Sequence, residues 1–100
     1  MPALKLNFPH QLGQADAMSR LQSLLEKVKQ RHGDKVSNLR ESWAANVLSF
    51  GFSTYGFNVE GDVTVDENEV RLDGKIPFTA MIFKGKIEQE LRETMSRVLS

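Results

Sequence analysis

The spacing of apolar residues changes twice along the chain, and this change constrains the fold more than any other feature. Over residues 14–32 apolar side chains recur every three or four positions, the period of an amphipathic helix. Over residues 36–76 they recur every second position, the period of strands with one buried face. The helical period then returns up to Val98, and a short alternating segment, 3–8, precedes the first helix. The order is therefore β-α-β-β-β-β-α, which is an α+β fold.

Each predicted helix has an apolar stripe. Gly33 can adopt the left-handed conformation that ends the first helix, and Pro77 can occupy the first turn of the second. Gly85 would weaken a helix interior by about 0.8–1 kcal/mol relative to Ala. Either Gly85 has a packing reason, or the second helix begins there. The stripe of the first helix comprises Ala17, Met18, Leu21, Leu24, Leu25 and Val28; that of the second comprises Ala80, Phe83, Ile87, Leu91, Met95 and Val98.

The central segment predicts four strands joined as consecutive antiparallel hairpins. The strands span 36–43, 47–53, 57–65 and 69–76, separated by turn residues at 45–46, 55–56 and 66–68. In the first of them, Glu41 would share a face with Leu39 and Trp43. At Asp73-Gly74 the alternation continues, so we expect a bulge rather than a turn. The prediction is a single domain, 1–100, whose curved antiparallel sheet packs against a long C-terminal helix.

Composition excludes several classes of function. The chain has 13 Lys+Arg against 13 Asp+Glu, so no net charge attracts nucleic acid. It has no Cys, which excludes disulfides, thiolate nucleophiles and Cys-ligated metals. The longest nearly apolar run, Ile76–Phe83, is far shorter than the ~20 residues that span a bilayer. With no signal sequence at the N-terminus, we expect a soluble cytoplasmic protein that does not bind nucleic acid.

The sequence predicts no catalytic residue, metal or cofactor. The segment 51–55 places Tyr55 where a nucleophile elbow needs its second Gly. His10 and His32 have no partner at metal-ligand spacing, and we expect them to cap element ends or to be solvated. Three carboxylates on the predicted strands are expected to lie on a solvated sheet face, with Arg71 and Lys75 as cross-strand partners. These are Glu60, Asp62 and Asp73.

Aromatic residues are unevenly distributed: all except Phe8 lie between Trp43 and Phe83. They could form the core between sheet and helix, line a ligand cavity, or form an exposed patch. The segment 77–83 is the best candidate for such a patch, because its seven residues cannot all face inward. The candidate residues for contact with an apolar ligand or surface are Phe50, Phe52, Tyr55, Phe57, Phe78, Met81 and Phe83.

Four strings distributed over the chain carry a family resemblance: LNFPH at 6–10, GFSTYGF at 51–57, VRLDG at 70–74 and FKGKIE at 83–88. With them, the chain resembles the small polyhydroxyalkanoic acid system protein family. The resemblance implies a bacterial protein encoded with genes for polyhydroxyalkanoate synthesis, storage and use. It implies the storage granule surface or granule proteins as partners, and no established catalytic residue. The element order is also similar to a shortened helix-grip domain, a fold that commonly holds an apolar ligand between sheet and C-terminal helix.

Three functional hypotheses follow. The first is a non-enzymatic accessory protein of polyhydroxyalkanoate storage, which is granule-associated or regulatory. The second is a small carrier or sensor that binds an apolar acyl ligand between the sheet and the C-terminal helix. The third, an enzyme acting on hydroxyacyl substrates, has the weakest support because no nucleophile, base or metal cluster is visible. A sheet edge or the apolar segment could also form a homodimer.

Overall fold

The computed structural model describes residues 3–32, 37–54 and 56–100, and its elements confirm the predicted α+β order. All strand pairs are antiparallel, in the order β1-β5-β4-β3-β2, so the first strand lies beside the last. Tyr55 of the predicted Tyr55-Gly56 turn lies outside the described residues, and so does Gly33, which is expected to end the first helix. In chain order the elements are β1 (Ala3–Pro9), α1 (Gln14–His32), β2 (Ser37–Ala44), β3 (Val47–Thr54), β4 (Phe57–Val65), β5 (Glu69–Lys75), the 3₁₀ helix η1 (Phe78–Phe83) and α2 (Lys84–Val98).

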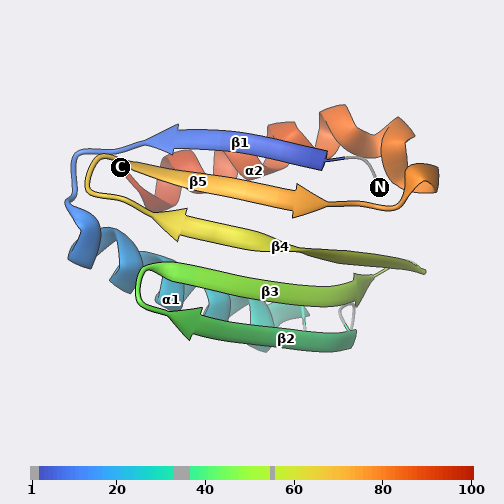
Figure 1. The fold of residues 1–100 in the computed structure, drawn as a ribbon, viewed down its shortest axis with the longest axis horizontal. Coiled ribbons are helices and arrows are strands. Elements are labelled where there is room, and N and C mark those ends of the chain that lie inside the picture. Colours follow the sequence, from blue (N-terminus) through green and yellow to red (C-terminus); the bar gives the residue numbers. More distant parts are fainter. Residues whose placement is uncertain (1–2, 33–36, 55) are drawn as a thin grey trace.

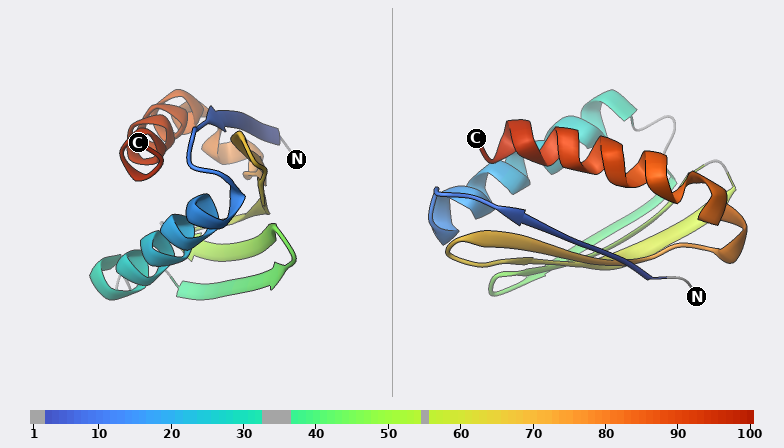
Figure 2. Two further views of the ribbon diagram at one scale, coloured as in Figure 1. Left: turned by 90° about the vertical axis from the view of Figure 1, so that its left-hand side faces the viewer. Right: turned by 90° about the horizontal axis from the view of Figure 1, so that it is seen from above.

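Both α-helices lie on one face of the twisted sheet (Figures 1 and 2). Helix α2 lies over the β1 side, and α1 lies over the β3–β2 side. The opposite face is covered by neither of the described helices and carries the polar alternate positions of the strands. The sheet is thus apolar on the helix side and solvated on the other, as the period of two predicts.

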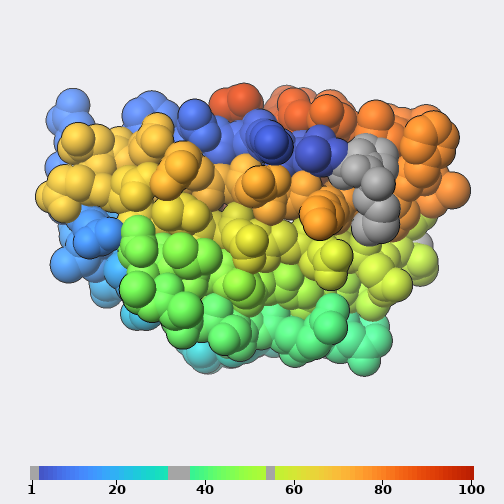
Figure 3. All heavy atoms as spheres, in the orientation of Figure 1, coloured from blue at the N-terminus to red at the C-terminus, as the bar shows by residue number. Residues whose placement is uncertain are grey.

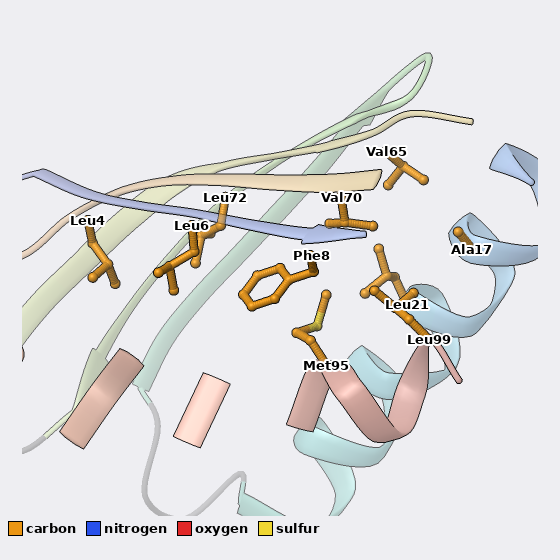
Figure 4. Packing of buried hydrophobic residues seen from close by; sticks show 10 residues of the cluster. All are labelled: Leu4, Leu6, Phe8, Ala17, Leu21, Val65, Val70, Leu72, Met95 and Leu99. Carbon is orange, nitrogen blue, oxygen red and sulfur yellow. The ribbon is translucent and has the colours of Figure 1, made fainter. Parts of the chain in front are cut away.

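The core lies where α1 begins and α2 ends (Figure 4). Strand β1 shows the alternation most clearly, with every second side chain buried. The Arg20 guanidinium ties the two helix ends together, because it donates hydrogen bonds to the carbonyl oxygens of Val98 (3.2 Å) and Ser100 (2.6 Å). The buried cluster comprises Leu4, Leu6, Phe8, Ala17, Leu21, Val65, Val70, Leu72, Met95 and Leu99.

His10 is a buried cap at the junction of β1, α1 and the β4–β5 turn. Its Nδ1 accepts a hydrogen bond from the Leu12 N–H (3.2 Å). Because Nδ1 is an acceptor, the ring proton is on Nε2, which donates to the Asp66 carbonyl oxygen at 3.1 Å. The expected capping role is confirmed, and the alternative of a solvated ring is wrong, since His10 is only 7% exposed.

The bulge expected at Asp73-Gly74 is wrong. Strands β4 and β5 pair without a register shift, and Gly61 lies directly opposite Gly74. A Cβ built at Gly61 would lie 2.6 Å from the Asp73 carbonyl oxygen and 2.7 Å from the Gly74 Cα. The glycine pair therefore permits a close approach of two regular strands. The register shift lies in β2 instead, between Ser37 and Arg40.

The second helical segment starts as η1 and becomes α-helical only at Lys84. Gly85 is therefore in the first turn of α2, where its low helix propensity costs little, and this resolves the alternative left open by the sequence. A 3₁₀ helix has 3.0 residues per turn against 3.6 in an α-helix. Phe83 lies one 3₁₀ turn after the buried Ala80, but its side chain is 48% exposed, so its predicted place in the buried stripe is wrong.

Candidate functional site

Four large apolar side chains are exposed together on η1, and we call this group the apolar tip. The exposed fractions are 80% for Phe78, 37% for Met81, 83% for Ile82 and 48% for Phe83. The tip lies at one end of the long axis of the molecule (Figures 1 and 3). Exposed apolar side chains that gather in one place, unlike scattered single ones, are typical of interaction sites.

Two buried residues fix the tip to the body of the protein. Ile76 is 2% exposed and Ala80 is 5% exposed. Pro77 has an extended conformation (φ −60°, ψ 148°), and its carbonyl oxygen accepts a hydrogen bond from the Ala80 N–H at 2.9 Å. The proline and this hydrogen bond turn the chain sharply after β5. Ile76 and Ala80 therefore act as anchors. The residues 78–79, between them, and 81–83, after Ala80, are exposed.

Lysines lie close to the tip, and the nearest acidic residues in the chain are Asp73 and Glu88. Residues 74–87 contain Lys75, Lys84 and Lys86 and no Asp or Glu. Lys75 lies opposite Glu60 in the sheet, which offsets its charge. Lys84 and Lys86 belong to the first turn of α2, and within the described part of the chain neither forms an ion pair with a carboxylate.

The candidate residues that lie on strands of the sheet form a second group, separate from the apolar tip. Phe50, Phe52 and Phe57 are half-buried on β3 and β4. The rings of Phe50 and Phe52 are stacked with centroids 6.2 Å apart, and Phe50 also packs against the core cluster. The end of the β3–β4 hairpin and η1 lie at the same end of the sheet (Figure 1). Tyr55 lies outside the described residues.

Three residues of the site are not singled out by any pattern in the sequence. Ile82 belongs to the predicted patch 77–83 but not to the individually named candidates, and it is the most exposed large hydrophobic residue of the described ranges. Lys84 and Lys86 were assigned no role. The absence of acidic residues from 74–87 was a visible signal for both lysines. The period of three and four places Ile82 off the predicted stripe, so its exposure agrees with that pattern.

Between the sheet and α2, Leu6, Phe8 and Met95 belong to one core cluster. Two hollows on the described surface are open to solvent. Neither has the enclosed apolar wall of a lipid-carrying cavity. The first hollow is lined by Asn38, Arg40, Ser53, Asn58, Val59 and Glu60, and the second by Asn7, Phe8, Pro9, Arg92, Met95, Ser96, Leu99 and Ser100.

The three strand carboxylates lie on the solvated face as expected. Glu60 is opposite Lys75, as predicted. Asp62 is opposite Asp73 and accepts a hydrogen bond from the Ser49 hydroxyl at 2.9 Å. The prediction of Arg71 as a partner for these carboxylates is wrong, because its guanidinium binds Asp66 at 2.8 Å. Among the described residues, no three His, Asp or Glu side chains are grouped to hold a metal ion.

A comparison of the chain with models of known protein families gives one match. The family model described as "putative polyhydroxyalkanoic acid system protein" matches residues 4–99. The chain belongs to this family. Its membership confirms the resemblance carried by the four strings and connects the chain with polyhydroxyalkanoate storage. No curated protein and no solved structure matches this family member. None of the helices within the described ranges is both long and apolar enough to cross a membrane.

Proposed function

We propose that the protein is a non-enzymatic, cytoplasmic accessory protein of polyhydroxyalkanoate storage that contacts the granule surface directly through the apolar tip. Family membership supports the connection with storage. The exposure of Phe78 and Ile82, at 80% and 83%, is the observation that carries the choice of surface. A hydrophobic polymer particle is a matching partner for an apolar group that is held rigidly at one end of a small protein.

The size of the tip predicts reversible binding. With about 200 Å² for a fully exposed large side chain, the four exposed fractions give about 500 Å² of apolar surface. At about 25 cal/mol per Å², full burial would contribute roughly 12 kcal/mol. The loss of translational and rotational freedom costs an estimated 4–15 kcal/mol. The net free energy of binding is therefore modest, and removal of one or two tip side chains is expected to abolish detectable binding.

Co-sedimentation with washed granules stripped of protein tests this proposal. The double variant Phe78→Ser/Ile82→Ser is expected to lose at least tenfold in bound fraction, because it removes the two most exposed apolar side chains. Both side chains are outside the core, so the variant is expected to fold. The matched control is Gln89→Ser/Glu90→Ser, two exposed polar positions on α2.

Inert hydrophobic beads separate granule recognition from general stickiness in the same experiment. Unchanged binding of the folded tip variant would contradict the choice of surface. Binding of the wild-type protein to coated but not to stripped granules would contradict direct contact and indicate a granule protein as the partner.

The half-buried phenylalanines of the sheet favour a second candidate function, an acyl-ligand carrier or sensor. Phe50, Phe52 and Phe57 offer an apolar surface beside the core rather than within it. Native mass spectrometry with added hydroxyacyl or fatty ligands tests this candidate. A carrier or sensor is expected to give a protein–ligand adduct that is lost in the Phe52→Ala variant. Detection of the bare chain mass alone would count against this candidate function.

A further inference from the structure

The apolar tip is flanked by unpaired positive charge, and this feature identifies its partner more narrowly. Lys84 follows Phe83 directly, and Lys86 is an exposed residue in the first turn of α2. Within the described ranges, neither lysine forms an ion pair, although Glu88 and Glu90 follow one turn later on α2. Large apolar side chains with lysines at their border are typical of segments that lie in the interface of an anionic lipid layer.

We infer that the apolar tip docks on an anionic lipid surface, with Phe78 and Ile82 entering the acyl region and Lys84 and Lys86 binding headgroups. The inference rests on the proposed function, because it uses the same four side chains. It adds the chemistry of the surface that they meet. The position of the tip at one end of the long axis allows Phe78 and Ile82 to reach such a layer while the body of the protein stays in water (Figure 3).

A second copy of the chain matches this surface less well. A standard protein–protein interface buries about 800 Å² per partner, and the tip offers about 500 Å² of apolar surface. Two tips placed together would also bring Lys84 and Lys86 of one copy toward those of the other. An anionic lipid layer has neither disadvantage, because its area is unlimited and its charge is complementary.

Flotation with vesicles tests the inference. Vesicles of phosphatidylglycerol are compared with vesicles of phosphatidylcholine, at low salt and at 0.5 M salt, conditions under which charge attraction is respectively long-ranged and screened. The wild-type protein is expected to bind phosphatidylglycerol vesicles at least tenfold more tightly, with most of this preference lost at high salt. Lys84→Gln/Lys86→Gln is expected to lose roughly thirtyfold in affinity for the anionic vesicles.

A matched control removes the same charge elsewhere. Lys5→Gln/Lys27→Gln changes two exposed lysines, one on the open sheet face and one on α1, and is expected to bind as the wild type does. The single variant Lys86→Gln, at an exposed position, guards against misfolding of the double variant. Equal losses in both double variants, or equal binding to both lipids, would overturn the inference.

Parallel sedimentation with lipid-free polymer particles separates the two proposals. Binding to the polymer without binding to anionic vesicles would overturn this inference and leave the proposed polymer contact intact. Binding to anionic vesicles without binding to granules would support this inference and overturn the proposed function.

Discussion

At the scale of single residues, Ala45 has a backbone conformation that its side chain disfavours. In the β2–β3 turn its φ is 53°, in the left-handed region. This conformation costs an L-residue about 1–2 kcal/mol, whereas Gly adopts it freely. The greater freedom of Gly in the unfolded chain cancels about 0.4–1 kcal/mol of that gain. We therefore expect Ala45→Gly to raise the free energy of unfolding by about 0.5 kcal/mol, measured by urea denaturation.

Ala44→Gly is the control for this prediction. Ala44 is the last residue of β2, where Gly gains no conformational advantage, and we expect this variant to be slightly less stable than the wild type. A loss of stability in Ala45→Gly equal to that in Ala44→Gly would contradict the account of the turn.

Single residues also show how far the sequence could be interpreted. The position of His10 at the end of an apolar alternation predicted a cap, and the ring does accept the Leu12 N–H. Its second partner, the Asp66 carbonyl oxygen, is 56 residues away in the chain and depends on the pairing of β1 with β5. Similarly, Glu41 was visible as a charge on an apolar face, but its partner Lys29 on α1 was not. Local patterns predict the role of a residue, and only the tertiary fold supplies a distant partner.

At the scale of secondary-structure elements, the opposed glycines of β4 and β5 are not equivalent. A Cβ at Gly61 would meet backbone atoms of β5 at 2.6 and 2.7 Å, whereas a Cβ at Gly74 would have no neighbour closer than 3.7 Å. Backbone atoms within a paired sheet cannot yield as a flexible side chain can. We expect Gly61→Ala to lower the free energy of unfolding by about 2–3 kcal/mol, and Gly74→Ala to change it by less than about 1 kcal/mol.

Thermal and urea denaturation of the two glycine variants measure this difference directly. Each variant is the control for the other, because both insert one methyl group on the same face at the same level of the sheet. Equal destabilisation by the two substitutions would contradict the close approach of the strands at Gly61.

The elements themselves were more predictable than their pairing. The period of two located the four central strands, and the period of three and four located α1 with its observed bounds. The register between β4 and β5 was not visible, so Gly74 was assigned a bulge when its role is to face Gly61. The 3₁₀ turn was missed for a related reason: six residues are too few for a period of 3.0 to be distinguished from one of 3.6.

At the scale of the whole molecule, counting alone predicted an exposed patch within 77–83, since one turn and its flank cannot bury seven residues. Within this segment the apolar stripe predicted Ala80 and Phe83 as buried, which is confirmed for Ala80 and wrong for Phe83. The structure assigns anchoring to Ala80, supported by Ile76, and exposure to the four tip residues. Net charge was a poor guide at this scale, because a sum of zero conceals the segment 74–87, which has lysines and no acidic residue.

The central claim, that the apolar tip is the surface that meets the granule, is tested most directly by site-specific labelling. The chain has no Cys, so a single introduced Cys carries a single label. Thr79, an exposed residue of η1, is changed to Cys and labelled with a polarity-sensitive fluorophore; Ser42→Cys, exposed on β2, is the matched control. On addition of granules, we predict a blue shift for the label at 79 and none at 42. A shift at 42 alone, equal shifts at both positions, or granule binding without a shift at 79 would contradict the claim.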